Sequence, residues 1–319
     1  MPIKPQTISV YITSYNQPEY LALALESVLT QTRKPDQIVI IDDASTDSSQ
    51  DLIRSYQQQH QGLITPVFNE TNQGIAESRK RAIQATTGDL ISSLDGDDLY
   101  LPNKLQLQEQ ALLDNPKAGY AYSNFAFIDE SGTQTGVWYD DDTLPSGDLF
   151  EHVACRRFPS NACHRNELIR REALLGAMDY EHGKNLFEDF DTLLRLSRFN
   201  TAVAVKEVTH LYRLHAVGLS RVSFAKHHDA LNYFFAKNAH LLDDLDPKKK
   251  QSIQAGINTL LANTAWRSVR QMAKGQLKRD TSAPAPGPFH YAKSGIAHQP
   301  LSILSPKRAS HLIRALIKY

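Results

Sequence analysis

Cysteine is scarce in this chain: among 319 residues there are only Cys155 and Cys163. They lie eight positions apart, and neither belongs to a CxxC or a Cys/His pattern. The sequence therefore predicts neither a structural zinc site nor a disulfide framework, and a reducing compartment is expected.

Long apolar runs and the common phosphate-binding loops are missing as well. No run of about eighteen apolar residues occurs, and the first residues lack the basic start and apolar core of a signal peptide. We therefore expect a cytoplasmic protein. There is no GxxxxGK[ST] motif and no GxGxxG motif after the first predicted strand, so a bound nucleotide would be held by a metal ion and side chains.

The two signs of charge are separated along the chain, although 35 basic residues balance 35 acidic ones. From Leu245 onward there are 13 Lys and Arg and 2 Asp, so this part carries +11 and the first 244 residues carry −11. The split predicts a separate surface function for the C-terminal part, with an anionic partner among the options. We expect no nucleic-acid partner.

Short β-rich runs alternate with helical patterns from Ile8 to Ile128, which is typical of βαβ units around a mainly parallel sheet. The predicted strands cover residues 8–14, 37–42, 64–69, 90–94 and 120–128. Helices are predicted to begin at Pro18, after the polar turn 44–47, near Gly74 and at Pro102. The fold class is therefore α/β, with helices flanking the sheet and a helical extension at the C-terminal end.

The pattern is less regular beyond residue 128. Residues 129–165 predict loops and short strands, 169–175 and 187–199 helices, 203–215 a β-rich segment and 224–278 further helix. Residues 281–294 hold three prolines and a glycine, which predicts a linker.

Polar residues follow the predicted strands, at the edge where open parallel sheets bind ligands. The carboxylates within residues 95–98 repel one another unless a cation compensates them. Mg²⁺ or Mn²⁺ suits this place, because one or two carboxylates, phosphates and water complete its shell. A solvated acidic turn explains the same cluster, and the cluster alone does not decide between the two. The polar residues are Thr13, Tyr15, Asn16, Asp42, Asp43, Asp95, Asp97 and Asp98.

Two of these positions have an ordinary structural explanation as well. The turn after Asp43 can be a helix start capped by Ser45 or Thr46, although this leaves two carboxylates at the strand end unexplained. Tyr15 is either a rim tyrosine or a platform for a nucleobase, whose stacking contributes about 1 to 3 kcal/mol.

The ordered set of motifs resembles glycosyltransferase family 2, whose members are inverting enzymes with the GT-A fold. The resemblance covers about residues 7–222. It rests on ISVYITSYN at 8–16, IIDDASTD at 40–47, NQG at 72–74 with Arg79, LDGDD at 94–98, FEDFD at 187–191 and YRLH at 212–215. It implies transfer of a sugar from a nucleotide diphosphate donor, a UDP-sugar or dTDP-sugar above all, to an acceptor hydroxyl.

The resemblance also implies which residues bind the nucleotide. Thr13, Tyr15 and Asp43 would surround the nucleobase, and Asp43 would accept a hydrogen bond from a uracil-like imide. Arg79 would lie near the base and the phosphates.

Asp95 and Asp97 would form the DxD pair of the family, with Asp97 the more direct ligand of Mn²⁺ or Mg²⁺. Arg213 and His215 would lie in the segment that covers the diphosphate. Asp189 would be the general base. This chemistry needs a cation for the departing diphosphate and a base beside the acceptor hydroxyl.

Asp189 has a competing explanation at the start of a predicted helix. Acids in a first turn complement the helix dipole, and for that purpose Glu188 and Asp189 would be interchangeable.

The resemblance predicts a GT-A domain over residues 1–222, with the nucleotide sugar bound by about 7–128 and the acceptor by about 129–222. A helical extension (223–280), the linker (281–294) and a basic amphipathic segment (295–319) would follow. The acceptor would be a glycan or a lipid-linked glycan, contacted by residues 140–165, and the pathway would be the synthesis of bacterial cell-surface polysaccharide.

The basic segment predicts a helix from Ser305 and Pro306 to Tyr319. Such a helix either lies on an anionic membrane, at the inner face where a lipid-linked acceptor would reside, or packs on its own domain or a partner. Its apolar side holds Leu312, Ile313, Leu316 and Ile317, and its other side holds Lys307, Arg308, His311, Arg314 and Lys318.

Three alternatives stay open. A glycosidase would use two carboxylates without a required metal. A sugar nucleotidyltransferase would show a Gly-rich loop after the first strand, where this chain has TSYNQ. A sugar-nucleotide-binding relative without catalysis would not need Asp95, Asp97 and Asp189 together.

Overall fold

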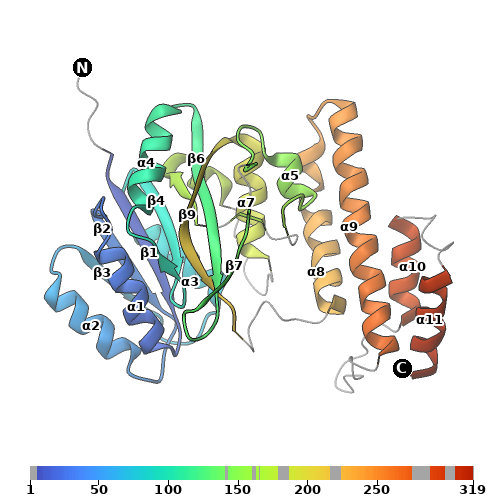
Figure 1. Ribbon diagram of the computed structural model, residues 1–319, viewed down its shortest axis with the longest axis horizontal. Helices are drawn as coiled ribbons and strands as arrows, with labels where there is room; N and C mark the ends of the chain where they lie inside the picture. The colour runs from blue at the N-terminus through green and yellow to red at the C-terminus, as the bar shows by residue number, and fades with distance from the viewer. Residues whose placement is uncertain are drawn as a thin grey trace. The chain divides into compact units, whose positions relative to one another are not determined.

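The computed structural model describes residues 6–140, 143–159, 163–164, 166–178, 187–215, 224–274, 288–298 and 306–318. The chain forms two compact units (Figure 1), one within Met1–Val153 and Arg157–Ala216, the other within Ala154–Arg156 and Val217–Tyr319. Several predicted features lie outside the described residues: Asp141, Asp142 and Arg165 of the acceptor stretch, and linker residues 281–287.

The first unit is built on one mixed sheet with the strand order β3-β2-β1-β4-β8-β6-β9-β5, and β7 pairs with β6. β3, β2, β1 and β4 are parallel to one another, β8 is antiparallel to β4 and β6, and β6 is parallel to β9. The predicted α/β fold with a mainly parallel sheet is confirmed. The strands are β1 Ile8–Ser14, β2 Gln37–Asp42, β3 Ile64–Phe68, β4 Leu90–Asp95, β5 Leu99–Tyr100, β6 Ala118–Ile128, β7 Gln134–Val137, β8 Leu168–Arg170 and β9 Thr201–Arg213.

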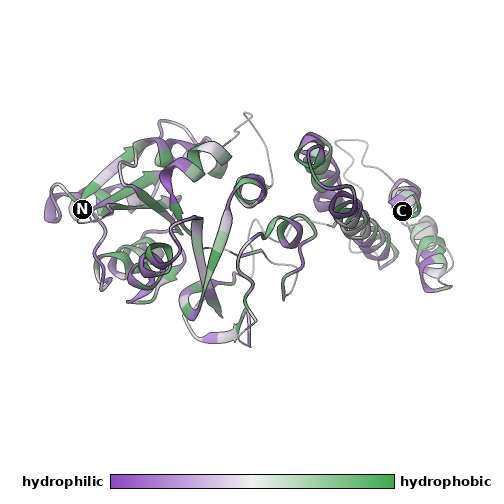
Figure 2. Cartoon of the chain, turned by 90° about the horizontal axis from the view of Figure 1, so that it is seen from above, coloured by the Kyte–Doolittle hydropathy of each residue, from purple (hydrophilic) through white to green (hydrophobic). Residues whose placement is uncertain are grey.

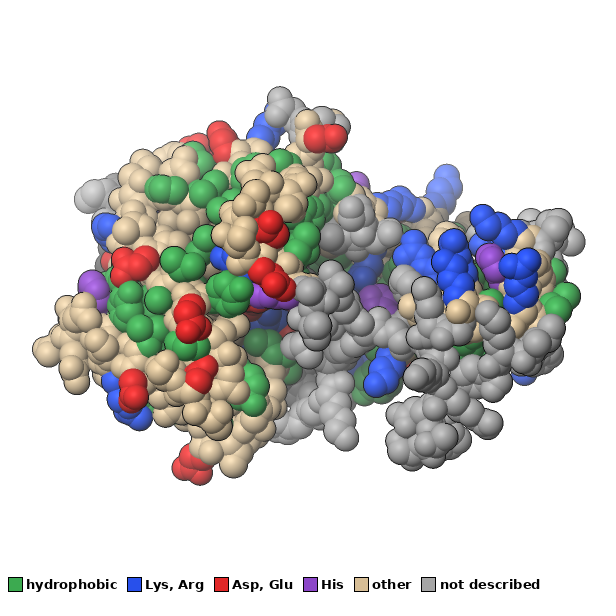
Figure 3. Space-filling view, turned by 60° about the horizontal axis from the view of Figure 1, so that its bottom comes forward, with side chains coloured by type: hydrophobic (Ala, Val, Ile, Leu, Met, Phe, Trp, Pro, Cys, Tyr) green, Lys and Arg blue, Asp and Glu red, His purple; other side chains and the backbone are tan. Residues whose placement is uncertain are grey.

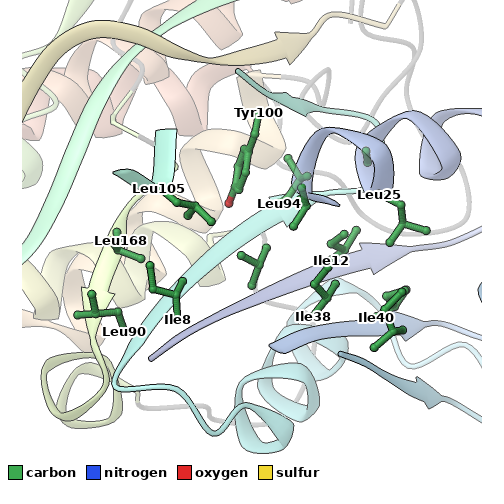
Figure 4. Close-up of a cluster of buried hydrophobic side chains, with 14 of the residues drawn as sticks. Ile8, Ile12, Leu25, Ile38, Ile40, Leu90, Leu94, Tyr100, Leu105 and Leu168 are labelled. Atoms are coloured by element: carbon green, nitrogen blue, oxygen red, sulfur yellow. The ribbon is translucent and has the colours of Figure 1, made fainter. Parts of the chain in front are cut away.

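Both faces of the central strands are covered, because every residue of β1 is buried. Side chains alternate across a strand. Ile8 and Ile12 therefore pack with Leu25 of α1 on one face (Figure 4), whereas Tyr11 packs with Ile83 of α3 on the other. The helices of this unit are α1 Pro18–Leu29, α2 Ser49–Gln59, α3 Ile75–Ala85, α4 Lys104–Asp114, α5 Phe150–Ala154, α6 Arg171–Ala177 and α7 Glu188–Phe199.

Helical expectations were wrong in one place in this unit. Ile169, predicted to be helical, belongs to β8, and the helix begins only at Arg171. The apolar residues Leu168 and Ile169 fit the pattern of a helix as well as that of a strand. These two residues form a strand because they pair with β4 and β6.

The second unit consists of helices with polar and apolar residues mixed around their circumference (Figure 2). The predicted helix 224–278 is interrupted, because Asp246 caps a new helix by accepting hydrogen bonds from the backbone of Lys248 and Lys249. Residues 288–294, predicted as linker, open α10 instead, since Pro288 can occupy the first turn of a helix. The elements are α8 Phe224–Lys237, a 3₁₀ helix Ala239–Leu242, α9 Pro247–Ala273, α10 Pro288–His298 and α11 Pro306–Lys318.

Within the described residues, no helix combines the length and the apolar character needed to cross a bilayer.

Candidate active site

The carboxyl ends of β1, β2 and β4 meet at one edge of the sheet. The register pairs Thr13 with Asp95 and Ser14 with Asp42, so the residues that follow these strands are neighbours. The Thr13 hydroxyl donates to Asp95 Oδ1 at 3.1 Å. The sequence-predicted nucleotide and metal residues therefore share this edge.

Two tight turns at this edge are tied to each other. Asn16 and Ala44 have positive φ angles, 51° and 62°, a left-handed conformation that side chains rarely adopt. Asn16 Oδ1 accepts a hydrogen bond from Thr46 N at 2.8 Å, and Asn16 N donates to Ser45 Oγ at 2.9 Å. These bonds offset the backbone strain and fix the turn that carries Tyr15, whose side chain is half exposed.

Asp43 is buried, and its carboxylate organises the loop before α3. Oδ1 accepts hydrogen bonds from Asn69 Nδ2 at 2.6 Å and Gln73 N at 2.8 Å, and Oδ2 accepts one from Gly74 N at 2.8 Å. Each carboxylate oxygen has about two lone-pair directions, and within the described residues Oδ2 uses one of them, for Gly74 N. Sequence reasoning did not identify Asn69 or Gln73 as partners of Asp43.

Arg79, on α3, connects the strand-end carboxylates to α7. Nη2 donates to both oxygens of Asp95, at 2.8 and 3.0 Å, and Nη1 pairs with the carboxylate of Glu188. Burial works against the positive charge. Asp95 and Glu188 nevertheless hold the pKa of Arg79 well above its usual value. Arg79 thus bridges two acids, and its place near the phosphates of a donor stays a prediction.

Glu188 and Asp189, adjacent at the start of α7, occupy different environments. Glu188 is buried on Arg79, and burial, with a further contribution from Asp189, raises the pKa of Glu188 to about 7 against the opposing effect of Arg79. Asp189 is exposed, and its Oδ1 accepts a hydrogen bond from Phe190 N at 2.7 Å. The two acids therefore differ in exposure and in their contacts, and whether they are interchangeable in turnover stays a prediction to test.

The acidic turn after β4 contains a structural carboxylate. Asp98 is buried, where its Oδ2 lies 2.9 Å from His210 Nε2 and its Oδ1 accepts a hydrogen bond from Arg213 N at 2.8 Å. Asp98 therefore anchors the turn to β9. Sequence reasoning missed His210, because nothing in a β-rich run marks the partner of a distant acid.

Gly96 allows the turn to approach β1 closely. A Cβ at this position would lie 2.5 Å from the backbone oxygen of Thr13 and 2.7 Å from Gln17 Nε2. Because one of these atoms belongs to the backbone, the turn between Asp95 and Asp97 requires glycine here.

Asp97 is accessible, and 28% of its side chain is exposed. Its Oδ2 lies 2.9 Å from His215 Nε2. Burial, and then the neighbouring carboxylates of Asp98 and Asp95, raise the pKa of Asp97 to about 6. A cation would relieve this repulsion.

The carboxylates fit an oxygen-preferring divalent ion that also takes ligands from a substrate. Among the described residues, no group of three or more His, Cys, Asp or Glu could hold a metal without such help. Mg²⁺ and similar ions are commonly held by one or two carboxylates plus phosphates. Asp97, with Asp95 beside it, meets that requirement.

Arg213 and His215 enter the site from the end of β9 and the residues after it. Arg213 is buried, its Nε donates to the backbone oxygen of Asp97 at 2.8 Å, and its guanidinium lies 4.6 Å from the ring centroid of Tyr20. His215 contacts Tyr20 edge-on, with ring centroids 5.5 Å apart. Arg213 thus holds the turn at Asp97 in place through its backbone. Tyr20 contacts both Arg213 and His215, and sequence reasoning missed it.

A family model for glycosyl transferase family 2 matches residues 9–174, more than half of the chain. The chain belongs to glycosyltransferase family 2. Its matched region contains the β1, β2 and β4 edge, whereas Asp189, Arg213 and His215 lie beyond it.

Two curated relatives illustrate how similar known sequences are to this chain. An uncharacterised glycosyltransferase of Nostoc sp. is 38% identical over 133 residues, which cover 40% of this chain and 41% of the relative. TuaG of Bacillus subtilis, named for teichuronic acid biosynthesis, is 29% identical over 126 residues, which cover 40% of this chain and 49% of TuaG. The chain thus spans about half the length of the curated relatives it matches.

Solved structures share the fold at low sequence identity. Residues 1–349 of Staphylococcus aureus TarS, in complex with UDP-GlcNAc, superpose with a TM-score of 0.64 and 15% identity, over 98% of this chain and 89% of that fragment. The mannosyltransferase PcManGT from Pyrobaculum calidifontis, in complex with GDP-Man and Mn²⁺, gives a TM-score of 0.57 and 17% identity, over 99% and 88%.

Proposed function

We propose that this protein is an inverting glycosyltransferase that moves a sugar from a nucleotide diphosphate donor to an acceptor hydroxyl, assisted by a divalent metal ion. The observation that carries the proposal is the link formed by Arg79. It joins Asp95 of the DxD turn to Glu188, directly before the exposed Asp189. This link supports a carboxylate pair that would hold a cation and a separate carboxylate that would accept a proton.

Asp97, with Asp95, would hold Mn²⁺ or Mg²⁺ together with the donor diphosphate. Bound there, the ion would act as a Lewis acid toward the departing diphosphate. His215, 2.9 Å from Asp97 Oδ2, would orient this carboxylate. The Mn²⁺ bound by the fold relative PcManGT supports this choice of metal.

Asp189 would accept the proton of the acceptor hydroxyl. The hydroxyl oxygen attacks the anomeric carbon on the face opposite the diphosphate, and the bond between that carbon and the phosphate oxygen breaks. Its electron pair leaves with the nucleoside diphosphate, and the configuration at the anomeric carbon is inverted. Glu188 is unsuited to this step, because it is buried and paired with Arg79.

The donor base would stack on Tyr15, beside Thr13 and Asp43. Tyr15 offers a half-exposed ring, and Asp43 Oδ2 keeps one acceptor direction for an imide N–H. A pyrimidine such as uracil or thymine presents that group. UDP-sugars and dTDP-sugars are therefore the preferred donors in this proposal, and the UDP-GlcNAc bound by TarS supports it.

The acceptor would be a glycan or a lipid-linked glycan of a bacterial surface polysaccharide, extended at the cytoplasmic side of the membrane. The name of TuaG supports this class of pathway.

A panel of nucleotide sugars tests the proposal. Purified protein, Mn²⁺ and glycan acceptors should release nucleoside diphosphate from a UDP-sugar or dTDP-sugar, and NMR of the product should show the inverted anomeric configuration. Retention of configuration would contradict the direct displacement. Release of nucleoside monophosphate with a sugar phosphate would identify a different reaction.

A further inference from the structure

The last three helices carry positive charge without any acidic residue. The segments that form α9, α10 and α11 contain no Asp and no Glu, whereas residues 95–98 alone hold three acids. Basic side chains of these helices thus lack acidic neighbours on their own helix. They are Lys248, Lys249, Lys250, Arg267, Arg270, Lys293, Lys307, Arg308, Arg314 and Lys318.

Part of this charge gathers around one histidine of α11. Partial burial, and then the nearby cations of α9 and α11, lower the pKa of His311. The four surrounding cations are all exposed, and blue Lys and Arg side chains flank a purple histidine on this unit in Figure 3. We call this surface the basic patch; it consists of Arg270, Lys274, Lys307, His311 and Arg314.

Two described apolar residues of α11 pack inside the protein. Ala315 is fully buried in a cluster with Val269 and Met272 of α9, and Leu312 packs against the same cluster. Ile313 differs, because 59% of it is exposed. It precedes Arg314 by one residue, about 100° around the helix. Among the side chains of α11 that the structure describes, the exposed ones thus include cations with the large apolar Ile313 beside them.

We propose that the basic patch binds the anionic headgroups of a phospholipid surface, with Ile313 entering the apolar boundary beside it. This goes beyond the proposed function, since it concerns another surface and does not depend on sugar transfer. Attraction of exposed Lys and Arg to anionic lipids supplies the affinity, and a single apolar side chain adds to it. The mode differs from insertion of the whole apolar side of α11, which packing on α9 prevents.

The composition of the patch favours lipid over other polyanions. The patch contains no Phe, Tyr or Trp, whereas single-stranded nucleic acids are bound on platforms of such side chains. The neighbouring Trp266 is buried, with Arg308 5.5 Å from its ring centroid. An exposed isoleucine beside cations, as Ile313 is, adds apolar contact at a lipid boundary, which an inorganic polyanion does not offer.

Vesicle binding by the full chain tests the proposal. Vesicles of phosphatidylcholine alone are compared with vesicles of equal parts phosphatidylcholine and phosphatidylglycerol, and we expect binding to the anionic vesicles only. The variant Arg270→Gln/Lys274→Gln/Arg314→Gln should lose about 10²-fold in affinity, from the usual contribution of three cations near a charged surface. Equal binding to neutral vesicles, or unchanged binding by the variant, would overturn the proposal.

A matched control removes the same number of charges elsewhere on α9. Lys248, Lys249 and Lys250 lie at its start, about 30 Å from the patch, well beyond the Debye length of about 10 Å. Their replacement by Gln should change vesicle affinity less than about threefold. A loss as large as that of the patch variant would show that total charge matters and that the patch does not.

Ile313→Ser separates a lipid surface from a soluble polyanion. It should weaken binding to anionic vesicles by about tenfold and leave binding of inorganic polyphosphate unchanged. Unchanged vesicle affinity in this variant, together with lost polyphosphate affinity in the patch variant, would assign the patch to a soluble polyanion. Thermal melts and nucleoside diphosphate binding should match the wild type for all variants, which keeps a failure here distinct from a failure of the proposed glycosyl transfer.

Discussion

The two units of the protein use charge in opposite ways. At the sheet edge, each acid has identified partners at hydrogen-bond distance, as Asp98 has in His210 and Arg213, and Asp95 has in Arg79. On α9 and α11, the cations of the basic patch are exposed and have no acid on their own helices. The difference predicts large effects of single substitutions in the first unit and small, additive effects in the second.

The largest expected effect is that of Asp97→Asn. Removing the carboxylate that would hold the cation should lower kcat by at least about 10³-fold, since Lewis-acid stabilisation contributes several kcal/mol. The fold should persist, because Asp97 is accessible and makes no buried anchor. Steady-state transfer assays with Mn²⁺, repeated with excess EDTA for the wild type, measure it; full activity in EDTA would contradict the metal.

The substitution Asp98→Asn, one residue after Asp97, should lower the stability of the fold. In Asp98→Asn the amide replaces a buried carboxylate that serves His210 and the backbone of Arg213. We expect a loss of about 3 kcal/mol in the free energy of unfolding, measured by urea titration. If Asp97→Asn destabilised the protein more than Asp98→Asn, the division between an open ligand and a buried anchor would be wrong.

The first unit contains a buried cation, which contrasts with the exposed cations of the basic patch. Lys104 is fully buried, its Nζ donates to Ser92 Oγ and Gln108 Oε1, and burial lowers its pKa to about 7. Above that pH the unfolded chain keeps a proton that the folded chain releases. The free energy of unfolding should therefore rise by about 2 to 3 kcal/mol between about pH 7 and pH 9.

The variant Lys104→Met should lack this rise. Urea titrations of both proteins at the two pH values measure it. A parallel rise in the variant would assign the pH dependence to another group.

A smaller effect is expected at Tyr15. Loss of a half-exposed stacking ring in Tyr15→Ala should weaken uridine diphosphate binding by about 1 to 2 kcal/mol, measured by calorimetry. Uridine or thymidine diphosphate should bind the wild type more tightly than guanosine diphosphate. The reverse order would contradict the assigned base pocket.

The sequence predicted well where elements are long and buried on both sides. The bounds of β1 and β2 agree with the predicted runs 8–14 and 37–42, because continuous apolar residues between turn signals are typical of central parallel strands. β5 and β8 were not predicted, since two or three residues give no periodicity and only their pairing partners define them.

The site was predictable as a set of positions and less so as a set of contacts. The parallel register places Thr13 next to Asp95. The positions of the strand ends in the sequence already suggest that these two residues are neighbours. The bridge from Arg79 to Glu188 joins residues 109 positions apart, and no local pattern reveals it. The sequence also did not reveal that Glu188 is buried and Asp189 exposed. Which side of α7 faces the interior depends on how the helix packs in the folded protein.

The pair Glu188 and Asp189 offers the most direct test of the account. Transfer by Asp189→Asn and Glu188→Gln should be measured under single-turnover conditions with saturating donor and Mn²⁺. Asp189→Asn should slow transfer by about 10² to 10⁴-fold, the usual contribution of a general base, and leave donor affinity unchanged. Near-normal turnover in Asp189→Asn, with a loss of that size in Glu188→Gln and unchanged donor affinity, would contradict Asp189 as the base.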